Sequence, residues 1–78
     1  MTPARRKAAD SVIRTGAELR TWRRMIDVPQ TALARRLGKA RNTVSLWEQR
    51  KRLDDVVFEA IEALRYKLQM GDETTAQW

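Results

Sequence analysis

The sequence predicts an all-helical (all-α) fold, organised as a compact bundle of four to five helices. Apolar residues recur mostly three and four positions apart in several stretches, which is the period of an amphipathic helix. No stretch alternates apolar and polar residues in the way that a half-buried strand does. Proline and glycine stand between the helical stretches, where they begin and end helices. With 78 residues, the chain has room for one domain.

The N-terminal part of the chain changes character near residue 10. Residues 1–9 are basic and carry almost no large apolar side chain, so we interpret them as a flexible arm. From there an amphipathic pattern runs to residue 26, and we expect residues 10–70 to form the helical domain. Thr15 and Gly16 weaken the middle of the first helical stretch, because both residues have low helix propensity. The regular helix is therefore expected to begin as late as Thr15.

Two short helices are expected after a break at residues 27–29. Pro29 suits the first position of a helix, and the helix over residues 30–37 carries its apolar side chains on one face. Gly38 stands where a helix commonly turns left-handed and stops. A third helix is expected over about residues 41–49, so that only a tight turn separates the two.

The last predicted helix begins at Asp54, where an acidic side chain suits the positive end of the helix dipole. Its apolar residues are four, three and four positions apart and form a seam that faces the core or a partner: Val57, Ile61, Leu64 and Leu68. Gly71 ends this helix, and we expect residues 71–78 to form a frayed tail.

The charge of the chain indicates a polyanionic partner. Sixteen lysines and arginines against ten acidic residues give a formal net charge of +6. Such a balance favours binding to nucleic acid or to an anionic membrane surface. We favour nucleic acid, because the arginines are spread over several helices and no helix has one continuous basic face opposite an apolar one.

Composition excludes several classes of site. The chain has no cysteine and no histidine, which removes the usual zinc ligands, thiol nucleophiles, histidine bases and disulfides. We expect no metal and no cofactor, and we expect no enzyme because no nucleophile–base pair or phosphate-cradling glycine loop is present. Neither a membrane helix nor a signal peptide is evident, so we expect a cytoplasmic protein.

The helix after Gly38 has the residues needed to read bases. Arginine is the preferred bidentate donor to guanine, and asparagine pairs with adenine, so Arg41 and Asn42 at its start suit the major groove. The small residues Thr43 and Ser45 interleave with them. Basic residues flank this helix on both sides and suit phosphate contacts, which position a protein without reading sequence: Lys39, Arg50, Lys51 and Arg52.

Residues 19–52, LRTWRRMIDVPQTALARRLGKARNTVSLWEQRKR, resemble the Cro/cI-type helix-turn-helix domain of phage repressors and small bacterial regulators. The resemblance rests on a combination of residues and not on any single one: Gln30, Leu33-Ala34, Leu37-Gly38, Thr43-Val44-Ser45 and Trp47-Glu48. It implies a helix-turn-helix fold in which the helix beginning at Arg41 enters the major groove of double-stranded DNA.

The resemblance also implies roles for individual residues. Gln30 falls where the family's glutamine contacts a phosphate and braces the first residue of the recognition helix, and Arg23 and Glu48 fall where a structural salt bridge joins two helices. Base contacts are then expected from Arg41, Asn42, Ser45 and Leu46. From their positions in or beside this helix, and for Gln30 from the resemblance, backbone contacts are expected from Gln30, Lys39, Thr43, Arg50, Lys51 and Arg52. Independently of the resemblance, a basic arm can enter the minor groove, so arm contacts are expected from Arg5, Arg6 and Lys7.

The leading hypothesis is a sequence-specific transcriptional regulator, most simply a repressor that binds an inverted-repeat operator as a homodimer. Apolar residues left outside the core seam of the last helix indicate the dimer surface: Phe58, Tyr66, Leu68 and Met70. The alternative is the antitoxin of a toxin–antitoxin pair, which binds a toxin through residues 58–78 and also its own promoter.

Overall fold

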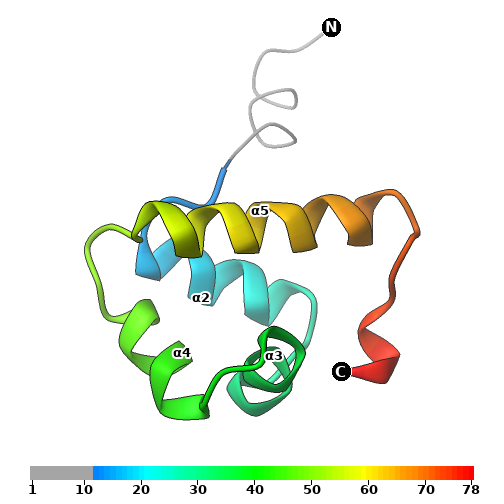
Figure 1. The fold of residues 1–78 in the computed structure, drawn as a ribbon, viewed down its shortest axis with the longest axis horizontal. Helices are drawn as coiled ribbons and strands as arrows, with labels where there is room; N and C mark the ends of the chain where they lie inside the picture. The colour runs from blue at the N-terminus through cyan, green and yellow to red at the C-terminus, as the bar shows by residue number, and fades with distance from the viewer. Residues whose placement is uncertain (1–11) are drawn as a thin grey trace, which may run out of the picture.

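The computed structural model describes residues 12–78, and all regular structure within this range is helical (Figure 1). The helices are α2 (Gly16–Met25), α3 (Gln30–Leu37), α4 (Arg41–Glu48) and α5 (Asp55–Gln69), followed by the short 3-10 helix η1 (Thr75–Gln77). The all-α prediction is therefore confirmed. Arg5, Arg6 and Lys7 of the predicted arm lie outside the described residues.

The four α-helices share one core. Each contributes one of the most deeply buried side chains: Leu19 from α2, Leu33 from α3, Val44 from α4 and Ile61 from α5. In Figure 1, α5 runs along one side of the molecule next to α2, and α3 and α4 lie on the side away from α5. Among residues 12–78, no helix has the length and apolar character that crossing a membrane requires.

The start of α2 is fixed by a capping box. The Oγ1 atom of Thr15 accepts a hydrogen bond from the backbone N–H of Glu18 at 3.1 Å, and a carboxylate oxygen of Glu18 accepts one from the backbone N–H of Thr15 at 3.0 Å. The late helix start expected at Thr15 agrees with this cap. The carboxylate has a lowered pKa, because the hydrogen bond from the backbone N–H of Arg14 outweighs the effect of burial.

Gly16 has a role that sequence reasoning missed. The N-terminus of α2 touches the end of α4 so closely that a Cβ atom at Gly16 would lie 2.3 Å from the backbone oxygen of Trp47. The backbone N–H of Gly16 donates to the carbonyl of Arg50 at 3.0 Å, and that of Leu53 donates to the carbonyl of Arg14 at 2.7 Å. This residue is therefore required for packing, although its helix propensity alone marks it as a weak point.

Left-handed backbone ends the two helices that precede α4. Asp27, after α2, has φ of 60°, and Gly38, after α3, has φ of 68°. At Gly38 the N–H groups of residues 38 and 39 donate to carbonyls in the last turn of α3, as in a Schellman-type end. Pro29 differs by one position from the prediction, because it is the residue before α3 and not its first helical residue.

Residues 72–78 differ from the frayed tail that we expected. The guanidinium of Arg36 binds both carboxylate oxygens of Glu73, and the indole N–H of Trp78 donates to the same carboxylate at 2.7 Å. Trp78 is half-buried against the core, and its backbone oxygen accepts from Arg35 at 3.0 Å. Side chains of α3, which lies far away along the chain, therefore hold the tail in place.

Candidate nucleic-acid interface

Helix α4 has one buried face and one exposed face. Val44 and Trp47 point into the core. Arg41 and Asn42 are exposed at its N-terminus, and Leu46 is 49% exposed one turn further along. Thr43 and Ser45 are half-buried between the two faces. The residues expected to contact bases therefore lie on the start and outer side of one short helix.

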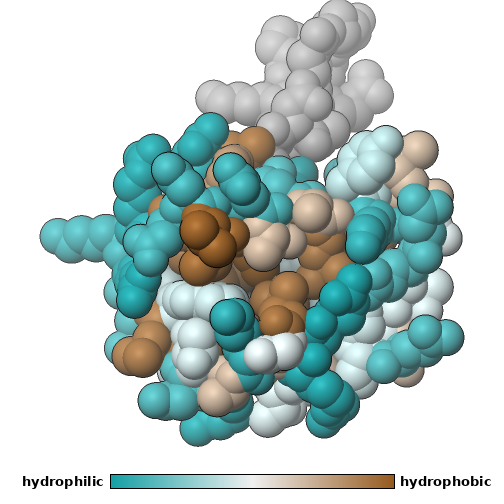
Figure 2. All heavy atoms as spheres, viewed as in Figure 1, coloured by the Kyte–Doolittle hydropathy of each residue, from teal (hydrophilic) through white to brown (hydrophobic). Residues whose placement is uncertain are grey.

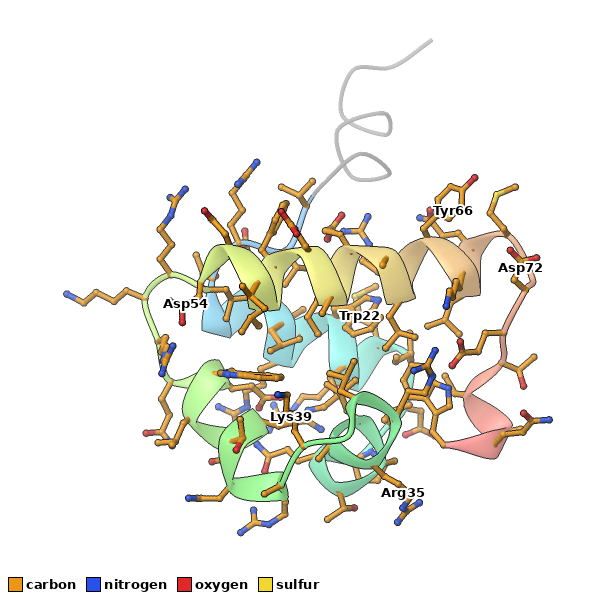
Figure 3. All side chains as sticks on the ribbon, viewed as in Figure 1. Trp22, Arg35, Lys39, Asp54, Tyr66 and Asp72 are labelled. Carbon is orange, nitrogen blue, oxygen red and sulfur yellow. The ribbon has the colours of Figure 1, made fainter. Side chains whose placement is uncertain are left out.

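The turn at residues 38–40 brings the N-terminus of α4 beside α3. Lys39 lies on this turn and is exposed (Figure 3). No side chain caps the start of α4, since the residue in front of it is Ala40. The positive dipole end of α4 is therefore left without a side-chain cap, next to the exposed Arg41. This end of the helix favours an anion.

Gln30 holds the first residue of α4 in place. The Nη1 atom of Arg41 donates to the Oε1 atom of Gln30 at 3.2 Å. The Nε2 atom of Gln30 donates to a carboxylate oxygen of Glu48 at 3.0 Å. The side-chain amide of Gln30 thus bridges α3 to both ends of α4.

A buried ion pair anchors this bridge. Arg23 donates from Nε and Nη2 to the two carboxylate oxygens of Glu48, at 2.6 and 3.1 Å, and from Nη1 to the backbone oxygen of Val28 at 2.9 Å. The two side chains are only 10% and 4% exposed. Arg23, Glu48, Gln30 and Arg41 form one hydrogen-bonded chain from the interior to the exposed start of α4.

Glu48 is held in its charged form. Burial by itself would raise the pKa of this carboxyl, but the hydrogen bonds from Arg23 and Gln30 and the nearby positive charges outweigh burial and lower it. A buried ion pair of this kind is costly to break, because the remaining partner is left as an uncompensated buried charge. The pair that holds Gln30 is therefore charged at neutral pH.

A polar hollow of about 570 Å³ lies beside this chain of hydrogen bonds. Arg41 lines this hollow, and so do three further side chains: Arg20 and Arg24 from α2, and Thr31 from α3. Sequence reasoning did not single out the two α2 arginines. Their spacing of four positions, which places them on the same side of α2, was the available signal.

The basic residues after α4 differ in how much of their charge is available. Lys51 and Arg52 are exposed and enter no ion pair among residues 12–78. Arg50 is in an exposed ion pair with Asp54 at 2.9 Å, four positions along the chain. Exposed pairs of this type contribute little to stability, so an added phosphate can compete for the guanidinium.

The four residues expected to form a dimer surface do not share one face. The ring of Phe58 lies under the guanidinium of Arg14, with the carbon at its centre 4.6 Å from the ring centroid. Leu68 lines an apolar groove between α2 and α5. Only Tyr66 and Met70 are well exposed, each at 59%. The prediction grouped them by apolar character, and the helical rotation separates them.

Residues 12–78 contain no group of three or more acidic, cysteine or histidine side chains that could hold a metal ion. No protein-family model, no curated protein and no solved structure matches the chain.

Proposed function

We propose that the chain is a cytoplasmic, sequence-specific DNA-binding transcriptional regulator of the helix-turn-helix type, acting as a repressor. In this proposal α4 enters the major groove of double-stranded DNA, and two copies bind an inverted-repeat operator. The observation that carries the proposal is the exposed start of α4, where Arg41 is braced by Gln30 and the Arg23–Glu48 pair.

The dimensions and chemistry of α4 suit this role. An α-helix with its side chains is about 10–12 Å wide, which matches a major groove about 12 Å wide. Arg41 offers two parallel donors to a guanine, and Asn42 offers a donor and an acceptor to an adenine. Bracing by Gln30 reduces the conformational freedom that Arg41 loses when it binds, so the contact is pre-organised.

The surroundings of α4 support phosphate contacts. Lys39 precedes it, Lys51 and Arg52 follow it, and all three are exposed. The hollow lined by Arg20 and Arg24 adds positive charge beside Gln30. A net charge of +6 adds a sequence-independent attraction that weakens as the salt concentration rises.

The test compares two substitutions that each remove one positive charge near α4. Arg41→Ala is expected to cost about 1–3 kcal/mol on the preferred duplex and to relax preference at one base pair. Lys51→Ala is expected to weaken all duplexes about equally and to lower the salt slope by about one unit. Fluorescence anisotropy titrations at several salt concentrations measure both.

Equal losses for the two variants on every duplex would refute base reading by Arg41. Loss of preference at a single base pair in Lys51→Ala would contradict its role as a phosphate contact.

A further inference from the structure

Helix α5 has an apolar face that the core does not use. Val57, Ile61 and Leu64 are its buried residues. A second set of apolar residues lies on another side and is exposed: Val56, Ala60, Ala63 and Met70. Val56 is 79% exposed and Met70 is 59% exposed.

These four residues form one stripe. Their spacing of four, three and seven positions repeats on one side of an α-helix, at roughly a third of a turn from the buried face. Figure 2 shows apolar residues on the front of the molecule at the level of α5, and in Figure 3 Tyr66 points away from the other helices. Because the buried face of α5 points toward the other helices, a stripe a third of a turn away from it faces sideways. Figure 1 shows α3 and α4 on the core side of α5.

The stripe is self-complementary about Ala63. Val56 and Met70 lie seven positions before and after this residue, and Glu59 and Lys67 lie four positions before and after it. In an antiparallel pair of α5 helices centred on Ala63, Val56 meets the partner's Met70, and Glu59 meets the partner's Lys67. Each contact occurs twice, as a two-fold interface requires.

Charge selects the antiparallel arrangement over the parallel one. In a parallel pair, Glu59 would face the partner's Glu59 and Lys67 would face the partner's Lys67, which is repulsive. Both side chains are exposed, and neither enters an ion pair among residues 12–78. Ala60 and Ala63 are small enough for the two helices to approach closely near the axis, toward the lower end of the usual range of about 8–10 Å.

We infer that two copies of the chain associate through this face of α5, antiparallel, with Ala63 at the two-fold axis. The axis is perpendicular to α5, and because the stripe faces sideways it leaves both α4 helices on the same side of the dimer. The inference deepens the proposed function, which needs two copies on one duplex, but the contact itself does not depend on DNA.

The interface is expected to be weak. The contact is limited to one face of a 15-residue helix that is only about 22 Å long. Its buried area is therefore expected to be at the small end of the range for specific interfaces. We therefore expect a dissociation constant on the order of 10 μM for the free protein.

Sedimentation equilibrium of the full chain without DNA tests the inference. Ala63→Arg places two like charges at the axis and is expected to raise the dissociation constant at least about tenfold. Ala63 is exposed, so the fold is expected to be retained, which circular dichroism verifies. A wild-type chain that stays monomeric at about 100 μM, or a dimer unaffected by Ala63→Arg, would overturn the inference.

A charge exchange tests the register separately. Glu59→Lys and Lys67→Glu are each expected to weaken the dimer, and the double variant is expected to restore most of the loss. Failure of the double variant to recover would overturn the antiparallel register. A chain that dimerises but prefers no DNA sequence would refute only the proposed function. A chain that is monomeric without DNA but still selects an inverted repeat would refute only the α5 contact.

Discussion

Gly16→Ala tests whether α2 and α4 touch as closely as described. An added Cβ atom would lie 2.3 Å from the backbone oxygen of Trp47 and 2.6 Å from that of Arg50. All of its nearest neighbours are backbone atoms, which cannot move aside as the end of a flexible side chain can. The two helices must therefore separate by about 1 Å to reach ordinary contact.

Several free-energy terms set the size of the effect. Overpacking of this kind costs about 1–3 kcal/mol, and weakening the hydrogen bond from Gly16 N–H to the Arg50 carbonyl costs about 0.5–1.5 kcal/mol. Alanine is favoured over glycine in a helix by at most about 1 kcal/mol. The net expectation is a loss of about 2 kcal/mol in the free energy of unfolding, or about 8–16 °C in Tm.

Urea unfolding followed by tryptophan fluorescence measures this loss. Gly38→Ala is the matched control, because no atom lies within 4 Å of its Cβ position and only the positive φ opposes the substitution. We expect the control to lose about 1 kcal/mol, less than Gly16→Ala. A Gly16→Ala protein as stable as wild type, or more stable, would refute the close contact, since propensity alone predicts stabilisation.

Two carboxylates provide further tests. Glu48→Gln leaves Arg23 buried without its counter-charge and should lower the free energy of unfolding by roughly 3 kcal/mol in urea titrations at pH 7; an unchanged value would contradict the buried pair. Because the folded pKa of Glu48 is lowered, this carboxylate stabilises the fold above its unfolded pKa of about 4.3, and the stabilisation is lost as the pH falls through the folded pKa. The variant lacks this stabilisation, so its free energy of unfolding should fall less in acid than that of wild type. The hydrogen bond from Arg36, against the opposing effect of burial, lowers the pKa of Glu73 to about 2. The indole N–H resonance of Trp78 should therefore keep its position down to about pH 3 and shift only below it, and a shift centred near pH 4.5 would show that the tail contact does not form.

Local patterns were sufficient to predict the helices. The breaks at Asp27 and Gly38 and the core seam of α5 follow from spacing and from residues that tolerate left-handed backbone. The exposed start of α4 was also predictable, because Val44 and Trp47 fix which side of that helix is buried.

Contacts between distant parts of the chain were not predictable from such patterns. The need for a glycine at position 16 comes from the end of α4, and the order of the tail comes from Arg36 on α3. The residues predicted to form a dimer surface do not share a face, because the helical rotation places Phe58 and Met70 on different sides of α5. The apolar pattern of α2 gives no sign of the arginines on its other side, which lie beside Gln30.

The central claim is that the exposed start of α4 discriminates between bases. Selection from a pool of random duplexes, at about 0.15 M salt, tests it most directly when wild type and Arg41→Ala are run in parallel. We predict that wild type enriches one motif with inverted-repeat symmetry and that the variant loses preference at one position in each half. Enrichment of no motif by wild type, or of the same motif by both proteins, would contradict the claim.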